Sequence, residues 1–110
     1  MTNRASDAIC RLNDELRTTF TGGSIIWTPC VSGLPEPHFS ALMDAVRSYT
    51  AFAVTNDPYG EHDFGAIPYD GKTYLWKIDY YAPDMQHGSD DPSDPAKTRR
   101  VLTIMRADEY

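Results

Sequence analysis

The chain has 110 residues, of which 41% are hydrophobic, 24% charged and 12% aromatic, and its formal net charge is −6. This length is near the commonest size of one domain, and the aromatic content excludes a disordered chain. No apolar run approaches the roughly 18 residues of a membrane span, and the first residues lack the apolar core of a secretory signal. We therefore expect a single cytoplasmic domain over residues 1–110, with no membrane partner.

The cysteine content argues against a disulfide framework and against zinc. Cys10 and Cys30 lie far apart, without a CxxC motif and without paired histidines. Cytoplasmic thiols are normally reduced, so both side chains are expected to be free. The pattern carries no zinc signature, and the sequence predicts no metal and no cofactor.

Negative charge is concentrated in one part of the chain. Residues 57–94 contain nine acids and two lysines, whereas the remainder contains seven acids and eight bases. An acidic surface repels phosphate groups and attracts basic proteins, so no direct nucleic-acid binding is expected. Two interpretations stay open: a surface that only keeps the protein in solution, and a surface that binds a basic partner.

The first half of the chain predicts a helix, a strand and a second helix. Apolar residues at spacings of three and four over 9–20 indicate a helix that ends before Gly22, with Arg17 outside the apolar stripe. The β-branched and aromatic run 24–31 predicts a strand. A second apolar stripe over 39–49 predicts another helix.

The second half begins with a hairpin. Asp70-Gly71 separates two runs, 62–69 and 72–81, and this dipeptide is typical of a type I′ turn, which requires positive φ at both central positions. Residues 82–96 contain three prolines and four aspartates, which predict an acidic loop. Residues 100–106 predict a last strand, with a helix as the alternative.

This order, α-β-α-β-β-β, predicts an α+β fold. We expect a four-stranded, mainly antiparallel sheet with two helices packed on one face. The opposite face would be partly exposed.

The two-residue turn fixes the hairpin register and so divides its residues between two faces. The face expected to meet the helices holds the apolar residues Ile67, Tyr74, Trp76 and Ile78. Gly65 lies opposite Trp76 and leaves room for the indole. The other face brings together three polar residues, His62, Lys77 and Asp79.

The polar face suggests a catalytic alternative. His62 is expected to oppose Asp79 with Cβ atoms about 5 Å apart, so that the carboxylate could orient the imidazole as a general base. A small hydrolase using His62, Asp79 and Glu61 is therefore one alternative, and an ordinary surface pair is another. Adjacent strand residues point to opposite faces, so Glu61, His62 and Asp63 cannot supply a compact set of three metal ligands unless the strand bends.

Three stretches carry a family resemblance: NDPYGEHDFG over 56–65, WKIDYY over 76–81 and TRRVLTIM over 98–105. They resemble a family of small bacterial proteins known as domain of unknown function 3768, and ICRLNDEL over 9–16 is similar to its start. The resemblance implies a free-standing protein of alphaproteobacterial type, linked to plasmids and other mobile elements, and it carries no activity. Small acidic proteins of such elements can inhibit basic defence proteins, as anti-restriction and anti-CRISPR proteins do.

The leading hypothesis is therefore a non-enzymatic interaction protein, without catalytic residues, that inhibits or regulates a basic nucleic-acid-handling protein. The hairpin end and the 82–96 loop would supply the contacts, with Tyr80 as a further anchor. The predicted partner-binding residues are Asp57, Tyr59, Glu61, His62, Asp63, Lys77, Asp79, Tyr81, Asp84, Asp90, Asp91 and Asp94. A homodimer formed through the exposed sheet face is the third alternative.

Overall fold

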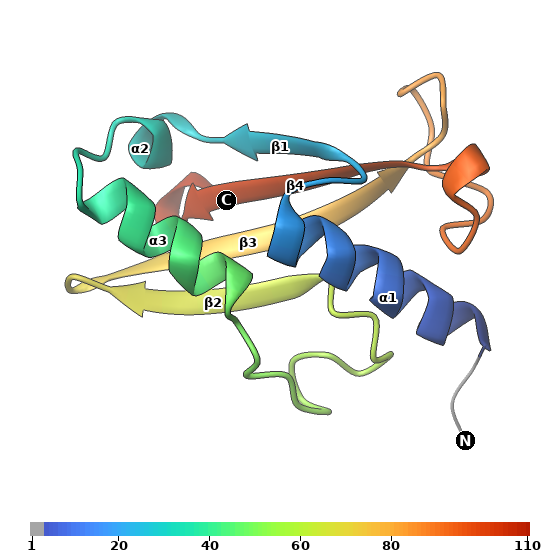
Figure 1. The fold of residues 1–110 in the computed structure, drawn as a ribbon, viewed down its shortest axis with the longest axis horizontal. Helices are drawn as coiled ribbons and strands as arrows, with labels where there is room; N and C mark the ends of the chain where they lie inside the picture. The colour runs from blue at the N-terminus through green and yellow to red at the C-terminus, as the bar shows by residue number, and fades with distance from the viewer. Residues whose placement is uncertain (1–3) are drawn as a thin grey trace.

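The computed structural model describes residues 4–110. Its helices and strands, shown in Figure 1, are α1 (Arg4–Thr19), β1 (Ser24–Trp27), α2 (Pro29–Ser32), α3 (His38–Arg47), β2 (Phe64–Tyr69), β3 (Lys72–Tyr81) and β4 (Arg99–Arg106). Two 3-10 turns complete the described part, η1 (Pro95–Lys97) and η2 (Ala107–Glu109). The α+β class is confirmed, and α2 is a helix that the sequence pattern did not predict. None of the described helices combines the length and apolar character needed to cross a bilayer.

The sheet is mixed and mostly antiparallel, in the order β1-β4-β3-β2. β1 runs parallel to β4, whereas β3 pairs antiparallel with both β4 and β2. In Figure 1, α1 and α3 lie side by side over the same face of this sheet. This arrangement confirms the predicted layers and leaves the other sheet face without a packed α1 or α3.

The predicted hairpin forms with its predicted register. Ile67 pairs with Tyr74 and Gly65 pairs with Trp76. The turn residues Asp70 and Gly71 have φ angles of 50° and 76°, as a type I′ turn requires. The first strand, however, begins at Phe64 rather than at residue 62.

The core lies between the helices and one face of the sheet. It includes the predicted hairpin residues Ile67, Tyr74, Trp76 and Ile78, and the Trp76 side chain is fully buried. Residues from α1, α2, α3 and β4 complete it: Leu16, Val31, Leu42, Met43, Val46, Leu102 and Ile104. Each large apolar side chain buried in this way stabilises the fold by about 1.5–3 kcal/mol relative to its exposure to water.

The strand predicted over 24–31 ends at Trp27, and this is a correction. The next residues form α2, in which Pro29 occupies a first-turn position and Gly33 follows the last residue. Proline suits the first turn because its missing N–H has no partner there in any helix. Cys30 therefore lies in α2 and not at a strand end. The second predicted helix ends at Arg47, earlier than the apolar stripe indicated.

The acidic loop over 82–96 is held by hydrogen bonds within itself and to residues next to it, Tyr80 in β3 and Thr98 just before β4. Ser89 N–H donates to the Tyr80 carbonyl at 3.0 Å, and Ala82 N–H donates to the His87 carbonyl at 2.7 Å. The Thr98 hydroxyl donates to the Asp91 carbonyl at 2.9 Å. The segment is thus an ordered loop between β3 and β4, and the last predicted strand is confirmed as β4.

Candidate functional site

The predicted pair of His62 and Asp79 does not form. His62 precedes β2 and has a φ of 56°, so its backbone leaves the alternation of the strand. Its Nδ1 lies 2.9 Å from Oδ1 of Asp14. Asp79 instead accepts a hydrogen bond from Lys77 Nζ at 2.6 Å. The three residues of the hydrolase alternative are therefore not assembled into one site.

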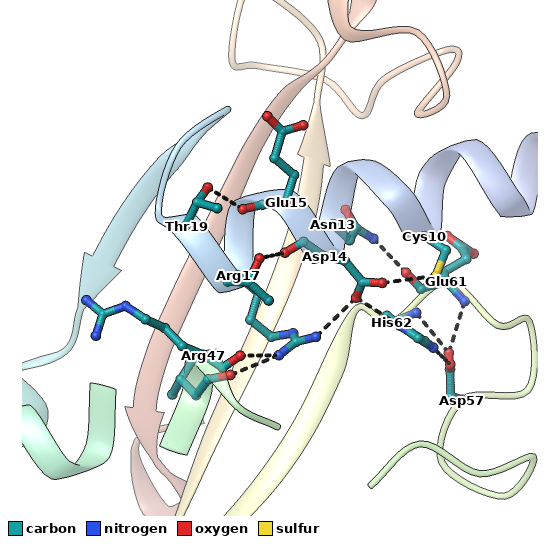
Figure 2. A network of polar contacts seen from close by, with 12 residues as sticks. Cys10, Asn13, Asp14, Glu15, Arg17, Thr19, Arg47, Asp57, Glu61 and His62 are labelled. Atoms are coloured by element: carbon teal, nitrogen blue, oxygen red, sulfur yellow. Dashed lines mark hydrogen bonds and ion pairs between the residues drawn. The ribbon is translucent and has the colours of Figure 1, made fainter. Parts of the chain in front are cut away.

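His62 belongs instead to a cluster on the helix side of the sheet, which we name the α1 cluster: Cys10, Asp14, Asp57 and His62 (Figure 2). The imidazole stacks on the Phe52 ring with centroids 3.7 Å apart and planes 2° from parallel. Its Nε2 lies 3.6 Å from Oδ2 of Asp57. The ring is therefore held in one plane with a carboxylate near each nitrogen.

Asp57 is a buried structural residue of this cluster. Its side chain is 6% exposed. Its Oδ1 accepts hydrogen bonds from the backbone N–H groups of Glu61 and His62 at 3.1 and 3.2 Å. The carboxylate thereby closes the turn that precedes β2, and it is not available to contact a partner as the sequence suggested.

The Cys10 thiol faces Asp14, with Sγ 3.6 Å from Oδ2. Burial, and then the Asp14 carboxylate, raise the pKa of the Cys10 thiol to about 11. The thiol therefore keeps its proton at neutral pH, whereas a thiol must lose its proton to act as a nucleophile. This geometry does not support a cysteine–histidine hydrolase.

A second polar network joins α1 to β3 and β4. Asn13 Nδ2 donates to the Tyr80 hydroxyl at 2.8 Å, and that hydroxyl donates to Glu61 Oε1 at 3.0 Å. Arg100 Nε donates to Asn13 Oδ1 at 2.8 Å, and Arg100 Nη2 also donates to the Pro92 carbonyl. Burial raises the pKa of both Glu61 and Tyr80. Tyr80 is therefore half-buried, and its hydroxyl is held inside this network and not offered to a partner as we expected.

Arg17 connects α1 to the end of α3. Its Nη1 donates to the carbonyls of Val46 and Arg47 at 3.1 Å each, and its Nη2 donates to Asp14 Oδ1 at 3.1 Å. The guanidinium carbon lies 5.2 Å from the centroid of the Trp76 ring. The side chain is 5% exposed, although it falls outside the apolar stripe of the helix. Figure 2 shows Arg17 reaching from α1 toward α3.

The opposite side of the sheet, which we name the open face, carries a groove of about 640 Å³. Val101 and Met105 lie in it and are 5% and 3% exposed, whereas Ile26 and Met85 are each 49% exposed. Its lining consists of Ile26, Thr28, Lys77, Asp79, Tyr81, Met85, Val101, Thr103, Met105, Glu109 and Tyr110. The open face thus combines apolar surface with the charges of the β3 residues.

Glu109 fixes one end of this groove. Its Oε1 accepts from the Thr28 hydroxyl at 2.7 Å and from Arg106 N–H at 2.8 Å, and its Oε2 accepts from Cys30 N–H at 3.0 Å. Burial alone would raise the pKa of Glu109, but these hydrogen bonds lower it to about 2. The carboxylate is therefore charged at neutral pH and ties η2 to α2.

The predicted partner-binding residues divide between the two sides of the sheet. Lys77, Asp79 and Tyr81 line the groove of the open face, next to the 82–96 loop. Asp57, Glu61 and His62 contact one another or α1 on the other side. Two further predicted residues lie in the segment before β2. Tyr59 is 75% exposed, whereas Asp63 is half-buried, and burial raises the pKa of its carboxyl group.

The acids of the 82–96 loop differ in their availability. Asp91 Oδ1 accepts from Ser93 N–H at 3.1 Å, and Asp94 Oδ1 accepts from Ala96 N–H at 2.9 Å, so these two carboxylates hold the loop. Asp84 also accepts from Gln86 N–H at 2.9 Å and pairs with His87, but Asp84 and Asp90 are exposed, whereas Asp91 and Asp94 are half-buried. The loop therefore presents Asp84 and Asp90 most directly to solvent beside the open face.

Comparison with known proteins identifies the family but not an activity. A family described as "Protein of unknown function (DUF3768)" matches residues 27–109. No curated protein and no solved structure matches the chain. The matched segment includes His62, the hairpin and β4, whereas Cys10 and Asp14 precede it. Because the match covers most of the sequence and agrees with the resemblance of the NDPYGEHDFG and WKIDYY stretches, the chain belongs to the DUF3768 family.

Proposed function

We propose that the protein is a non-enzymatic interaction protein whose open face binds a basic segment of a nucleic-acid-handling protein and thereby inhibits or regulates it. The observation that carries this proposal is the groove over β3 and β4, where apolar surface lies beside the acidic loop. Exposed apolar surface with a polar rim is typical of protein-binding sites. The same face offers a partner both contact area and charge.

The charge of the groove favours a basic partner. Its lining contains the carboxylates of Asp79 and Glu109 against the ammonium of Lys77, and that ammonium is already paired with Asp79. The exposed acids Asp84 and Asp90 add negative charge at the adjoining loop. A surface of this sign competes with phosphate groups for basic side chains, which is how it would interfere with nucleic-acid handling.

The chemistry of the groove supports binding rather than catalysis. The residues that line it include no histidine, cysteine or serine. Asp79 is held by Lys77 at 2.6 Å, so the carboxylate has a fixed partner. The Thr28 hydroxyl does donate to Glu109, but the hydrogen bonds to that carboxylate lower its pKa to about 2, which makes it a poor general base for activating a nucleophile.

Neutralising the exposed loop acids is expected to slow association with the partner. The double variant Asp84→Asn and Asp90→Asn removes two charges that steer a basic surface toward the open face. We expect the association rate constant to fall by about threefold to tenfold at low ionic strength, with a weaker salt dependence. The measurement is surface plasmon resonance, at two salt concentrations, against the basic protein that co-purifies with the chain.

The matched control removes the same charge from the other side of the sheet. Asp7 and Glu15 are exposed residues of α1, so Asp7→Asn with Glu15→Gln changes the net charge equally. We expect this control to retain most of the wild-type rate. Equal rates and equal salt dependence for the loop variant and the wild type would contradict the proposed role of the acidic loop.

A further inference from the structure

The α1 cluster contains three side chains of the kinds that bind transition metals. Within residues 4–110, Cys10, Asp14 and His62 each offer one ligand atom, and these atoms all lie within 4.8 Å of one another. The sulfur lies 3.6 Å from one carboxylate oxygen of Asp14, and the imidazole Nδ1 lies 2.9 Å from the other. Figure 2 shows the three side chains converging from α1 and from the segment before β2.

We propose that Cys10, Asp14 and His62 bind a zinc ion. A thiolate, a carboxylate and an imidazole are all ligands of zinc, with bond lengths of about 2.0–2.3 Å. In a tetrahedral site these bond lengths place ligand atoms about 3.3–3.8 Å apart. Sγ of Cys10 lies 3.6 Å from Oδ2 of Asp14, within this range. Nδ1 of His62 contacts the other oxygen, Oδ1, at 2.9 Å, so its side chain would rotate toward Oδ2 to reach the ion. Ligand atoms of the three residues already lie within 4.8 Å of one another, so rotations of side chains suffice to accommodate zinc.

Asp57 gives independent support because it occupies the position of an outer carboxylate. Zinc-binding histidines commonly donate their second ring N–H to a carboxylate, which fixes the tautomer and strengthens the ligand. Oδ2 of Asp57 lies 3.6 Å from His62 Nε2, and the side chain is 6% exposed. Phe52 stacks on the imidazole and sets its plane, so that Nδ1 faces Asp14 while Nε2 faces Asp57.

The charges around the cluster suit a divalent cation. Zinc binding would release the proton of the Cys10 thiol to solvent. Asp14, Asp57 and the resulting Cys10 thiolate then bring three negative charges, and Arg17, which contacts Oδ1 of Asp14, brings one positive charge. A zinc ion neutralises the remaining two. An ion bound through Oδ2 of Asp14, on the side of the sulfur, leaves Oδ1 to Arg17.

The site would keep an open coordination position. The protein supplies three ligands, and the side chains of His62 and Asp14 are 28% and 38% exposed, so solvent can reach the ion. Zinc would link α1 to the segment that enters β2, because Asp14 and His62 are 48 positions apart in the sequence. This site lies on the helix side of the sheet and is separate from the proposed partner-binding groove.

Cobalt and zinc binding test the proposal. We expect the reduced wild-type protein to bind one equivalent of Co²⁺, with a thiolate-to-cobalt absorption band and the strong visible bands of a tetrahedral site, both lost when Zn²⁺ is added. Cys10→Ser, which preserves the shape of the side chain, is expected to abolish the thiolate band. Asp57→Asn is expected to weaken Zn²⁺ binding about 10- to 100-fold, as measured by isothermal titration calorimetry.

The controls use the second cysteine and an exposed histidine. Cys30 is a free thiol in α2, and His87 pairs with Asp84 at the surface. Cys30→Ser and His87→Ala are therefore expected to leave the cobalt spectrum and the zinc affinity unchanged. Circular dichroism establishes that Cys10→Ser is folded. The proposal is overturned if the wild-type protein gives no saturable thiolate–cobalt band, or if the band survives in Cys10→Ser.

Discussion

Replacing Gly65 with alanine is expected to lower the free energy of unfolding by about 3 kcal/mol, at the upper end of what overpacking a core costs. A Cβ at this position would lie 2.3 Å from Trp76 Nε1 and 2.8 Å from Tyr49 Cζ. The Trp76 side chain is fully buried and contacts the rings of Tyr49 and Phe52, so it has little space into which to move. Urea denaturation monitored by tryptophan fluorescence measures the change.

Gly88 provides the matched control. A Cβ there would approach only the Tyr80 carbonyl oxygen, at 3.9 Å, which is an ordinary contact. We expect Gly88→Ala to change the free energy of unfolding by less than about 0.5 kcal/mol. If Gly65→Ala and Gly88→Ala lower the free energy of unfolding equally, the loss comes from replacing glycine in the backbone and not from a clash with the indole of Trp76.

Replacing Arg17 with alanine is the second variant with a large expected effect, a loss of about 3 kcal/mol or more. The substitution leaves the carbonyls of Val46 and Arg47 without the cation that caps α3, and it removes one of the partners of Asp14. It also opens a space beside the Trp76 ring. Loss of packing between α1 and α3 follows, which thermal and urea unfolding would both detect.

Arg11 serves as the control for this variant because it lies on the same helix and is exposed. Arg11→Ala changes the intrinsic helix propensity by the same amount as Arg17→Ala. We expect it to change the free energy of unfolding by less than about 0.5 kcal/mol. An Arg17→Ala protein as stable as Arg11→Ala would contradict the role assigned to the buried guanidinium.

Local chemistry made the hairpin predictable. The Asp70-Gly71 turn fixes the pairing of β2 with β3, and the pairing places Gly65 against Trp76. Alternation within β3 then separates the buried residues from Lys77 and Asp79. These relations depend on neighbours in sequence and on one turn type, so they can be predicted from the sequence alone.

The α1 cluster was not predictable because its contacts join distant segments. The sequence predicts a strand at His62, but the positive φ of this residue turns its side chain toward Asp14, 48 positions earlier. Arg17 falls outside the apolar stripe and is nevertheless buried, because its target is the end of another helix. Only the placement of Cys10 and Asp14 at i and i+4 of one helix was available as a signal.

The exposure of the predicted acids was a third property that composition could not reveal. Residues 57–94 hold the excess of negative charge, yet Asp57 closes a turn and Asp91 and Asp94 hold a loop. Short aspartate side chains commonly bond to their own backbone in this way. The acids left free to steer a partner are therefore fewer than the charge count suggests.

Site-specific photo-crosslinking in the native host tests the central claim, that the open face binds a basic partner. A benzoylphenylalanine in place of Ile26, which is 49% exposed in the groove, should crosslink a basic nucleic-acid-handling protein. The same crosslinker in place of Ser40, exposed on α3, should not. Crosslinking of that protein from position 40 instead of 26, or only of a second copy of this chain from position 26, would contradict the claim.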